Sequence, residues 1–239
     1  MPAQKLPQHI SKQFDEELED VRARVLSMGG LVEQQLSDAL RALTDSDIML
    51  GESVIDNETR VNTLEVSIDE ECTSILARRQ PAAGDLRLVV SVAKTITDLE
   101  RIGDEAEKIA KMAIELTGRH GPRSYYIGIN AMGNHVRSMV HGALDAFARM
   151  DSRAAVEVAR KEPESDDQYA AILRQLITYM MEDPRSITSS LDAVWVARAM
   201  ERIGDHARNI CENVIYFVEG KDVRHISIEE MEKEVNASN

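Results

Sequence analysis

Two copies of one short motif hold the side chains of this sequence that are best placed for chemistry. The five residues Glu-Arg-Ile-Gly-Asp begin at Glu100 and again at Glu201. In each copy the acidic residues stand four positions apart, so on a helix both carboxylates lie on one face. Carboxylate oxygens are the ligands that hard divalent cations prefer, and they also suit manganese and iron. The motif therefore predicts one cation site at Glu100 with Asp104 and another at Glu201 with Asp205.

A second row of oxygen-bearing side chains precedes the first motif, at successive spacings of four, three and four residues. This row consists of Glu58, Asn62, Glu65 and Asp69. Its members share one helical face, so they can complete a ligand set if their helix packs beside the motif. The equivalent positions of the second half are Glu162, Asp166, Tyr169 and Leu173. Because two acidic residues are lost there, we expect the first half to bind a cation better, with Mg, Mn, Fe or Zn as candidate ions.

The same carboxylates have a purely structural interpretation. Each motif could form ion pairs with arginines of neighbouring helices, such as Arg78 or Arg79. Crowded carboxylates also repel one another and raise their pKa values, so a cation or the nearby Arg101 and Arg202 must offset their charge. The sequence alone leaves metal binding and an ion-pair ladder open.

Enzyme classes find little support in the sequence. Di-iron oxidases use Glu-x-x-His pairs in helical bundles, and none of the six histidines follows a glutamate at that spacing. The sequence contains no glycine-rich phosphate loop and no recognisable nucleophile motif. We therefore expect a protein that is not an enzyme.

Composition narrows the partners and the compartment. The net charge is −14 and the isoelectric point is near 4.9. A negatively charged protein is repelled by nucleic-acid phosphates and by anionic membrane surfaces, so neither is expected as a partner. Two cysteines, Cys72 and Cys211, make no disulfide framework and are expected to be buried thiols. The absence of an 18-residue apolar run and of an apolar signal region predicts a cytoplasmic protein.

Apolar periodicity predicts the helices that must position the motifs. The expected helices are 10–44, 47–79, 84–117, 124–150, 152–182 and 185–219. Pro163 is expected to kink the fifth helix or to delay its start. The adjacent Gly29 and Gly30 mark either close packing or a bend, and the charged tail contains at most a short helix near 228–235.

Matches outside the motif show that the chain is a tandem duplication. They include Met28-Gly29 with Met132-Gly133, Ala39-Leu40 with Ala143-Leu144, and Ile109 with Ile210. Internal repeats of this kind indicate one structural unit used twice. The sequence predicts an all-α fold of two tandem antiparallel three-helix bundles, over 8–118 and 124–220, followed by a tail at 221–239.

A duplicated three-helix bundle with Glu-Arg-Ile-Gly-Asp at the same place in each half resembles the PhoU family of phosphate-specific transport accessory proteins. Further segments that support the resemblance are 28–33, 68–72, 79–81, 85–87 and 179–183. The resemblance extends over about 9–225. In the family a Glu/Asp-x-x-x-Asp motif occurs in each half and is associated with metal clusters in some members, and it maps here onto the four motif carboxylates with helix-two partners such as Glu65 and Asp69.

The resemblance also implies a function. Family members are negative regulators of the phosphate-starvation response. They are thought to link the phosphate transporter, through its ATPase PstB, to the sensor kinase PhoR, so that the regulator PhoB stays unphosphorylated when phosphate is plentiful. Many are homodimers, and contact with the membrane would occur only through partners. The competing hypothesis is a metal-binding structural or storage protein without a signalling role. Pro163, Tyr169 and Leu173 are atypical of the family and place the second metal site in doubt.

Overall fold

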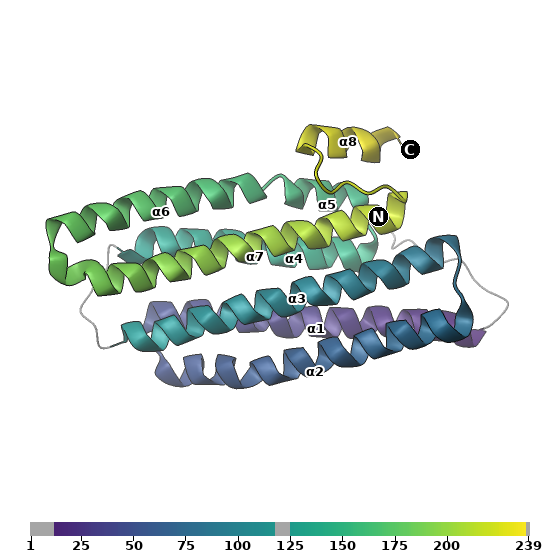
Figure 1. The fold of residues 1–239 in the computed structure, drawn as a ribbon, viewed down its shortest axis with the longest axis horizontal. Coiled ribbons are helices and arrows are strands. Elements are labelled where there is room, and N and C mark those ends of the chain that lie inside the picture. The colour runs from purple at the N-terminus through teal and green to yellow at the C-terminus, as the bar shows by residue number, and fades with distance from the viewer. Residues whose placement is uncertain (1–11, 118–124, 238–239) are drawn as a thin grey trace.

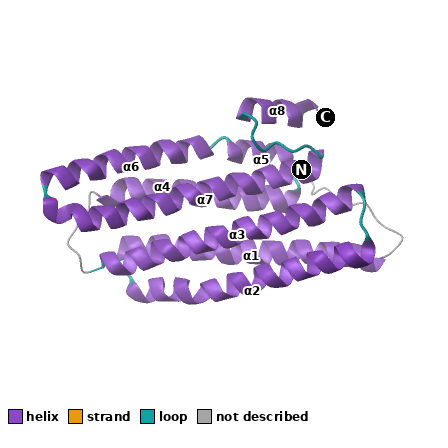
Figure 2. Ribbon diagram, in the orientation of Figure 1, coloured by secondary structure: helices purple, strands orange, loops and turns teal. Residues whose placement is uncertain are grey.

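The structure is a computed structural model that describes residues 12–117 and 125–237, and all of its long segments are helical (Figure 1). The helices are α1 (Lys12–Asp45), α2 (Ile48–Arg79), α3 (Ala83–Leu116), α4 (Tyr125–Arg149), α5 (Ser152–Ala159), α6 (Glu162–Glu182), α7 (Ile187–Glu219) and α8 (Ile228–Ala237). A 3-10 turn at Pro184–Ser186 joins α6 to α7. Within the described ranges there is no strand (Figure 2). The all-α prediction is confirmed.

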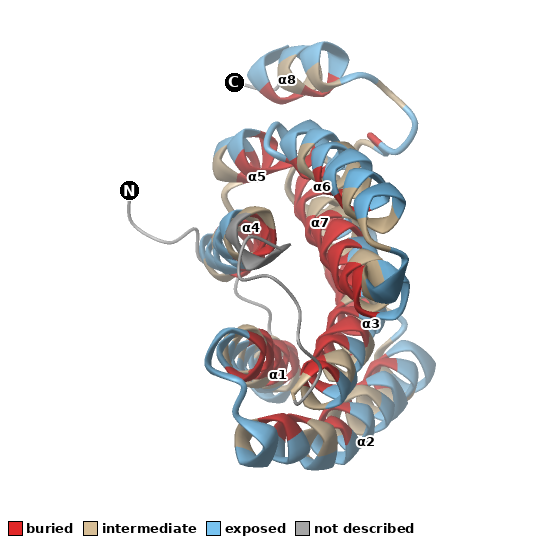
Figure 3. Cartoon of the chain, turned by 90° about the vertical axis from the view of Figure 1, so that its left-hand side faces the viewer, coloured by how far each residue is buried: buried red, intermediate tan, exposed pale blue. Residues whose placement is uncertain are grey.

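The helices form two three-membered bundles that pack along their whole length. Helices α1, α2 and α3 make the first bundle, and α4, α7 and the consecutive helices α5 and α6 make the second. The most extensive contact between any two helices joins α3 to α7, which run antiparallel across the boundary between the halves. Seen end-on, α2, α3, α7 and α6 make one curved layer, with α1 and α4 on its inner side (Figure 3). Tandem bundles were predicted, and they are found.

Two glycines explain how closely α1 and α4 approach each other. A Cβ on Gly29 would lie 2.3 Å from Cδ2 of Leu144, and a Cβ on Gly133 would lie 2.7 Å from Cδ2 of Leu40. The two contacts are reciprocal, because the glycine of each half packs against a leucine of the other half. Of the two interpretations of the glycine pair, close packing holds for Gly29, since α1 continues through it and nothing lies near Gly30.

Pro163 divides the predicted fifth helix in two. A proline in a helix interior lacks the N–H donor and clashes with the preceding turn, so α5 ends at Ala159 and α6 begins at Glu162. The break exposes backbone carbonyls, and the Lys161 carbonyl accepts a hydrogen bond from Nε2 of His135 at 2.9 Å. The helix was expected to be kinked or delayed at Pro163; it begins at Ser152 and is interrupted before the proline, which sets Glu162 in the first turn of a new helix.

The core is continuous from one half to the other. Ile102 and Ile203, the central residues of the two motifs, are completely buried and anchor α3 and α7 in it. Burying such a side chain contributes about 1.5–3 kcal/mol. Both cysteines are buried free thiols, as expected, and burial raises the pKa of Cys72 to about 12.

The tail folds as well. Met231 and Val235 of α8 are buried, and α8 packs on α5, so the short helix expected near 228–235 is present. None of the described helices combines the length and the apolar character needed to cross a membrane.

Candidate functional site

A buried glutamate marks the candidate site of the first half. Glu58 on α2 is only 6 % exposed, and Nε2 of Gln35 on α1 donates to its Oε2 at 2.7 Å. Its Oε1 finds no hydrogen-bond partner among the described residues. Gly103 of the motif makes room for this carboxyl group, because a Cβ there would lie 2.9 Å from Oε2. The glycine of Glu-Arg-Ile-Gly-Asp therefore admits a polar group between α2 and α3.

Burial is the main reason why the pKa of Glu58 rises to about 7. The hydrogen bond from Gln35 opposes this rise, whereas the nearby carboxylates Asp104, Glu107 and Glu100 add to it. The carboxyl group is therefore divided between its protonated and ionised forms near neutral pH. A cation placed among these groups would favour the ionised form.

The first motif places further carboxylate groups near Glu58. Burial, Asp104 and then Glu65 raise the pKa of Glu100, while Arg101 lowers it. Arg101 lies across the motif, with Nε 3.3 Å from Glu100 Oε2 and Nη1 3.5 Å from Asp104 Oδ2. These contacts are long, and Glu100 Oε2 has no hydrogen bond among the described residues although it is buried. The first-half site, defined as Glu58, Asn62, Glu65, Glu100 and Asp104, is thus short of positive charge.

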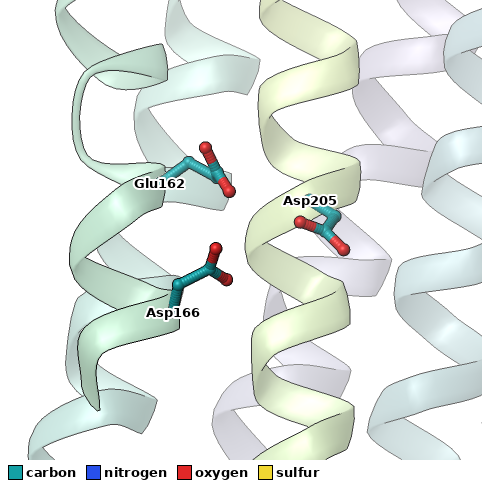
Figure 4. A group of neighbouring side chains, drawn as sticks. All are labelled: Glu162, Asp166 and Asp205. Carbon is teal, nitrogen blue, oxygen red and sulfur yellow. The ribbon is translucent and has the colours of Figure 1, made fainter. Parts of the chain in front are cut away.

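The second half brings three carboxylates together. One oxygen each from Glu162, Asp166 and Asp205 lies within 4.8 Å of the other two, the only such group of acidic, histidine or cysteine side chains in the described part of the chain. Glu162 and Asp166 extend from α6 toward Asp205 on α7 (Figure 4). Burial, followed by Glu162 and Asp166, raises the pKa of Asp205. We call Glu162, Asp166, Glu201 and Asp205 the second-half site.

Two arginines form hydrogen bonds with carboxylates of the second-half site. Nη1 of Arg208 donates to Glu162 Oε2 at 2.7 Å, and its Nε donates to Glu212 at 3.2 Å. Nη1 of Arg198 donates to Glu201 Oε1 at 2.5 Å. The buried Oε2 of Glu201 nevertheless has no hydrogen-bond partner among the described residues, as is true of Glu100 in the first half. Burial and then Asp205 raise the pKa of Glu201.

Polar contacts between α3 and α7 join the two helices that carry the motifs. Asp98 of α3 accepts hydrogen bonds from Nδ1 of His206 at 3.0 Å and from the side-chain amides of Asn209 and Asn213 at 3.1 and 3.3 Å. Elsewhere on the same seam, the buried Glu105 lies 3.1 Å from Nε of Arg202 and 2.9 Å from Nζ of Lys108. These contacts hold the two copies of the motif in a fixed relation.

The structure shows where the remaining residues singled out in the sequence lie. Arg78 and Arg79, offered as possible ion-pair partners of the motif, have other partners, since Arg79 pairs with Glu17 at 2.7 Å and Arg78 lies 3.4 Å from Glu71. Both arginines lie at the C-terminal end of α2, several turns from the motif. Asn62 and Asp69 are exposed on α2, and Glu65 is half-buried.

The expectation of a better ligand set in the first half is not matched by the geometry. The three-carboxylate group lies in the second half, because Asp166 supplies an oxygen anion where the first half has the amide Asn62. Sequence reasoning also missed Gln35 and Arg208. The first is a polar residue inside an apolar seam, and the second is an arginine aligned with Glu107, so both could have been noticed.

Fold and sites together define a duplicated helical protein with a carboxylate site in each half and no catalytic motif recognised in its sequence. A model described as "PhoU domain" matches residues 25–113 and again 129–214. The chain belongs to the PhoU family. This family consists of regulatory accessory proteins and not of enzymes, which confirms the prediction on that point.

Relatives and solved structures agree with the family. A Pseudomonas aeruginosa protein named phosphate-specific transport system accessory protein PhoU homolog is 53% identical over 96% of this chain and 95% of its own. The Escherichia coli protein named phosphate-specific transport system accessory protein PhoU is 49% identical over 98% and 96%. A crystal structure of the phosphate transport system regulatory protein PhoU from Streptococcus pneumoniae has a TM-score of 0.82, with 31% identity over 88% of this chain and 99% of that one.

Proposed function

We propose that this chain is a negative regulator of phosphate uptake and of phosphate-starvation signalling. It would connect the ATPase PstB of a phosphate transporter to the sensor kinase PhoR in the cytoplasm, so that PhoB stays dephosphorylated when phosphate is plentiful. The observation that carries this proposal is the match of both halves to one accessory-protein family, with relatives in phosphate-specific transport that cover nearly the whole chain. We further propose that the working form is a homodimer.

Cation binding fits the residues of both sites. One buried oxygen each of Glu58, Glu100 and Glu201 accepts no hydrogen bond among the described residues, and buried polar atoms are seldom left in this state. In the second half Glu162, Asp166 and Asp205 would hold the ion, whereas in the first half Glu58 and Asp104 would do so with Asn62. An all-oxygen set suits Mg²⁺, Mn²⁺ or iron better than Zn²⁺. The ion would supply positive charge that offsets the repulsion among the carboxylates.

Complementation tests the proposed function. In a host that lacks the gene for this protein, alkaline phosphatase is measured at high phosphate after supplying the wild type or a variant. The variant carries alanine at the four motif carboxylates, Glu100, Asp104, Glu201 and Asp205, and circular dichroism confirms that it folds. We expect the wild type to restore repression and the variant to fail. Unchanged high phosphatase with the wild type would overturn the regulatory proposal.

A second candidate is a metal-binding structural or storage protein. The three-carboxylate group of the second half is the observation that favours it. This candidate predicts substantial metal content in the purified protein together with no effect of the gene on phosphatase synthesis, so the same strains and an elemental analysis distinguish the two.

A further inference from the structure

We propose that the outer face of α6 and α7 is a docking surface for an acidic amphipathic helix of a partner protein. The surface consists of Tyr169, Leu173, Ile177, Leu191 and Trp195. Large exposed apolar groups are unusual enough on a single chain to indicate an interaction site when they are contiguous. The inference goes beyond the proposed function, because it specifies where a partner binds and which chemistry that partner must have.

Helical spacing and a ring contact show that the surface is contiguous. Tyr169, Leu173 and Ile177 follow one another at four-residue steps on α6, as do Leu191 and Trp195 on α7, so each set occupies one face. Helices α6 and α7 pack side by side. The guanidinium of Arg198, one turn beyond Trp195, lies 5.7 Å from the centroid of the Tyr169 ring and joins the two rows.

Three of the five residues of the surface are exposed, and Tyr169 and Leu173 are half-buried. Trp195, the sole tryptophan of the chain, is 63 % exposed. Leu191 and Ile177 are 47 % and 45 % exposed. Tryptophan, tyrosine and arginine are the residues in which binding energy is most often concentrated at protein interfaces, and all three types occur together here.

The duplication shows that this apolar character is not required by the fold. The equivalent positions of the first half are Glu65, Asp69, Thr73, Val90 and Lys94. One bundle therefore folds with charged or polar residues at four of the five positions where the other carries aromatic and aliphatic ones, and only Val90 is also aliphatic. The loss of acidic residues at Tyr169 and Leu173, which weakened the case for a second metal site, has a consequence of its own on this face.

Arginines lie at the border of the surface, interspersed with acidic side chains, in a chain whose net charge is −14. A cavity of about 600 Å³ adjoins Arg198, and its basic lining residues are Arg198, Arg202, Arg208, Arg224, His206 and His225. It also contains Glu162, Asp205 and Glu212, and Arg208 pairs with the first and the last of these. Arg198 and Arg202 remain about half exposed, at 47% and 45% of their side chains.

Charge complementarity selects the occupant. Each arginine has five N–H donors, so Arg198 and Arg202 can bind further carboxylates while they keep their contacts to Glu201 and Glu105. A helix with apolar side chains on one face and glutamates along its border would cover Trp195 and Leu191 and direct its carboxylates at these arginines. Binding of an amphipathic helix through apolar anchors at helical spacing is a common mode of recognition.

Fluorescence of Trp195 tests the proposal directly, because no other tryptophan contributes. The probes are a synthetic amphipathic helical peptide with leucines on one face and glutamates on the other, and a matched peptide with lysines in place of the glutamates. We expect the glutamate peptide to shift the emission to shorter wavelength. Leu191→Ala should weaken its binding by about tenfold, and Arg202→Ala should weaken it by less and reduce its dependence on salt. Val66→Ala, at a residue on α2 that is 57 % exposed, is the matched control and should bind normally.

Three results would overturn the proposal. They are no emission change with either peptide, equal binding of the lysine peptide, and a blue shift on raising the protein concentration alone, which would assign the surface to a second copy of the chain. In cells, Trp195→Ala is expected to lose phosphatase repression while Val66→Ala keeps it. If the wild type itself fails to repress, the proposed function fails, whereas the peptide titration still decides whether the surface binds an acidic helix.

Discussion

The two halves of this chain descend from one unit, and their equivalent buried glutamates are satisfied in different ways. Glu58 in the first half receives a neutral hydrogen bond from Gln35, and burial raises its pKa to about 7. Glu162 in the second half accepts a hydrogen bond from the guanidinium of Arg208. The position aligned with Arg208 in the first half is Glu107. In the first half Glu107 instead pairs with Lys111 at 2.6 Å. The charge at this position of α3 and α7 therefore decides whether the facing glutamate has an arginine partner, and without one the burial of Glu58 raises its pKa.

Removal of Arg208 should have the largest effect on this difference. Arg208→Ala leaves the buried Glu162 without its cation, and breaking one partner of a partly buried pair should cost about 2 kcal/mol of unfolding free energy. Denaturant unfolding at pH 7.5 measures the loss. The matched variant Glu107→Ala removes one partner of a more exposed pair and should change stability by less than about 0.5 kcal/mol. Equal losses in the two variants would show that the halves do not differ in this respect.

Substitution of the two buried glutamates should give effects of opposite sign. The pKa of Glu58 is raised from 4.5 to about 7 in the folded protein, so between these pH values the folded state binds more protons and stability falls as pH rises. Glu58→Gln removes this fall and should stabilise the protein by about 1–2 kcal/mol at pH 8, with little effect at pH 4.5. Glu162→Gln loses the charged partner of Arg208 and should destabilise at pH 8. Urea unfolding at both pH values tests the signs, and destabilisation by Glu58→Gln at pH 8 would contradict the assignment.

A divalent cation should stabilise the protein more modestly. At ten times the dissociation constant, Mn²⁺ should add about 1.4 kcal/mol through mass action alone, seen as a rise in melting temperature. Asp166→Asn, which gives the second half the amide that Asn62 provides in the first, should reduce the rise. Asn62→Asp should increase it. A rise that persists unchanged in Asp166→Asn would place the ion elsewhere.

Periodicity and composition were sufficient to predict the helices, the duplication and the break at Pro163, because each depends on local spacing or on the missing N–H of proline. The motif carboxylates were proposed as ligands from their spacing alone, and their role stays a prediction. The relative quality of the two sites was not predicted, although the exchanges of Asn62 for Asp166 and of Glu107 for Arg208 are visible in the sequence, because spacing within one helix does not show which oxygens of α6 and α7 come within 4.8 Å of one another.

Contacts between the halves could not be predicted from the sequence either. Asp98 with His206, and Glu105 with Arg202, are brought together only when α3 packs against α7. No spacing within one helix indicates such a pair. The domain limits 8–118, 124–220 and 221–239 stay a prediction, and residues 118–124 lie outside the described part of the chain.

We expect the second-half site to bind a cation better than the first-half site. The most direct test is to measure cation affinity after one of the two sites has been disabled by substitution. Calorimetric titration of Mn²⁺ would be compared among the wild type, Asp205→Asn and Asp104→Asn, with circular dichroism to confirm folding. Because Asp205 completes the three-carboxylate group, Asp205→Asn should lose the tighter binding event, whereas Asp104→Asn should retain it. Loss of the tighter event in Asp104→Asn, with full retention in Asp205→Asn, would contradict this division and restore the first half as the principal site.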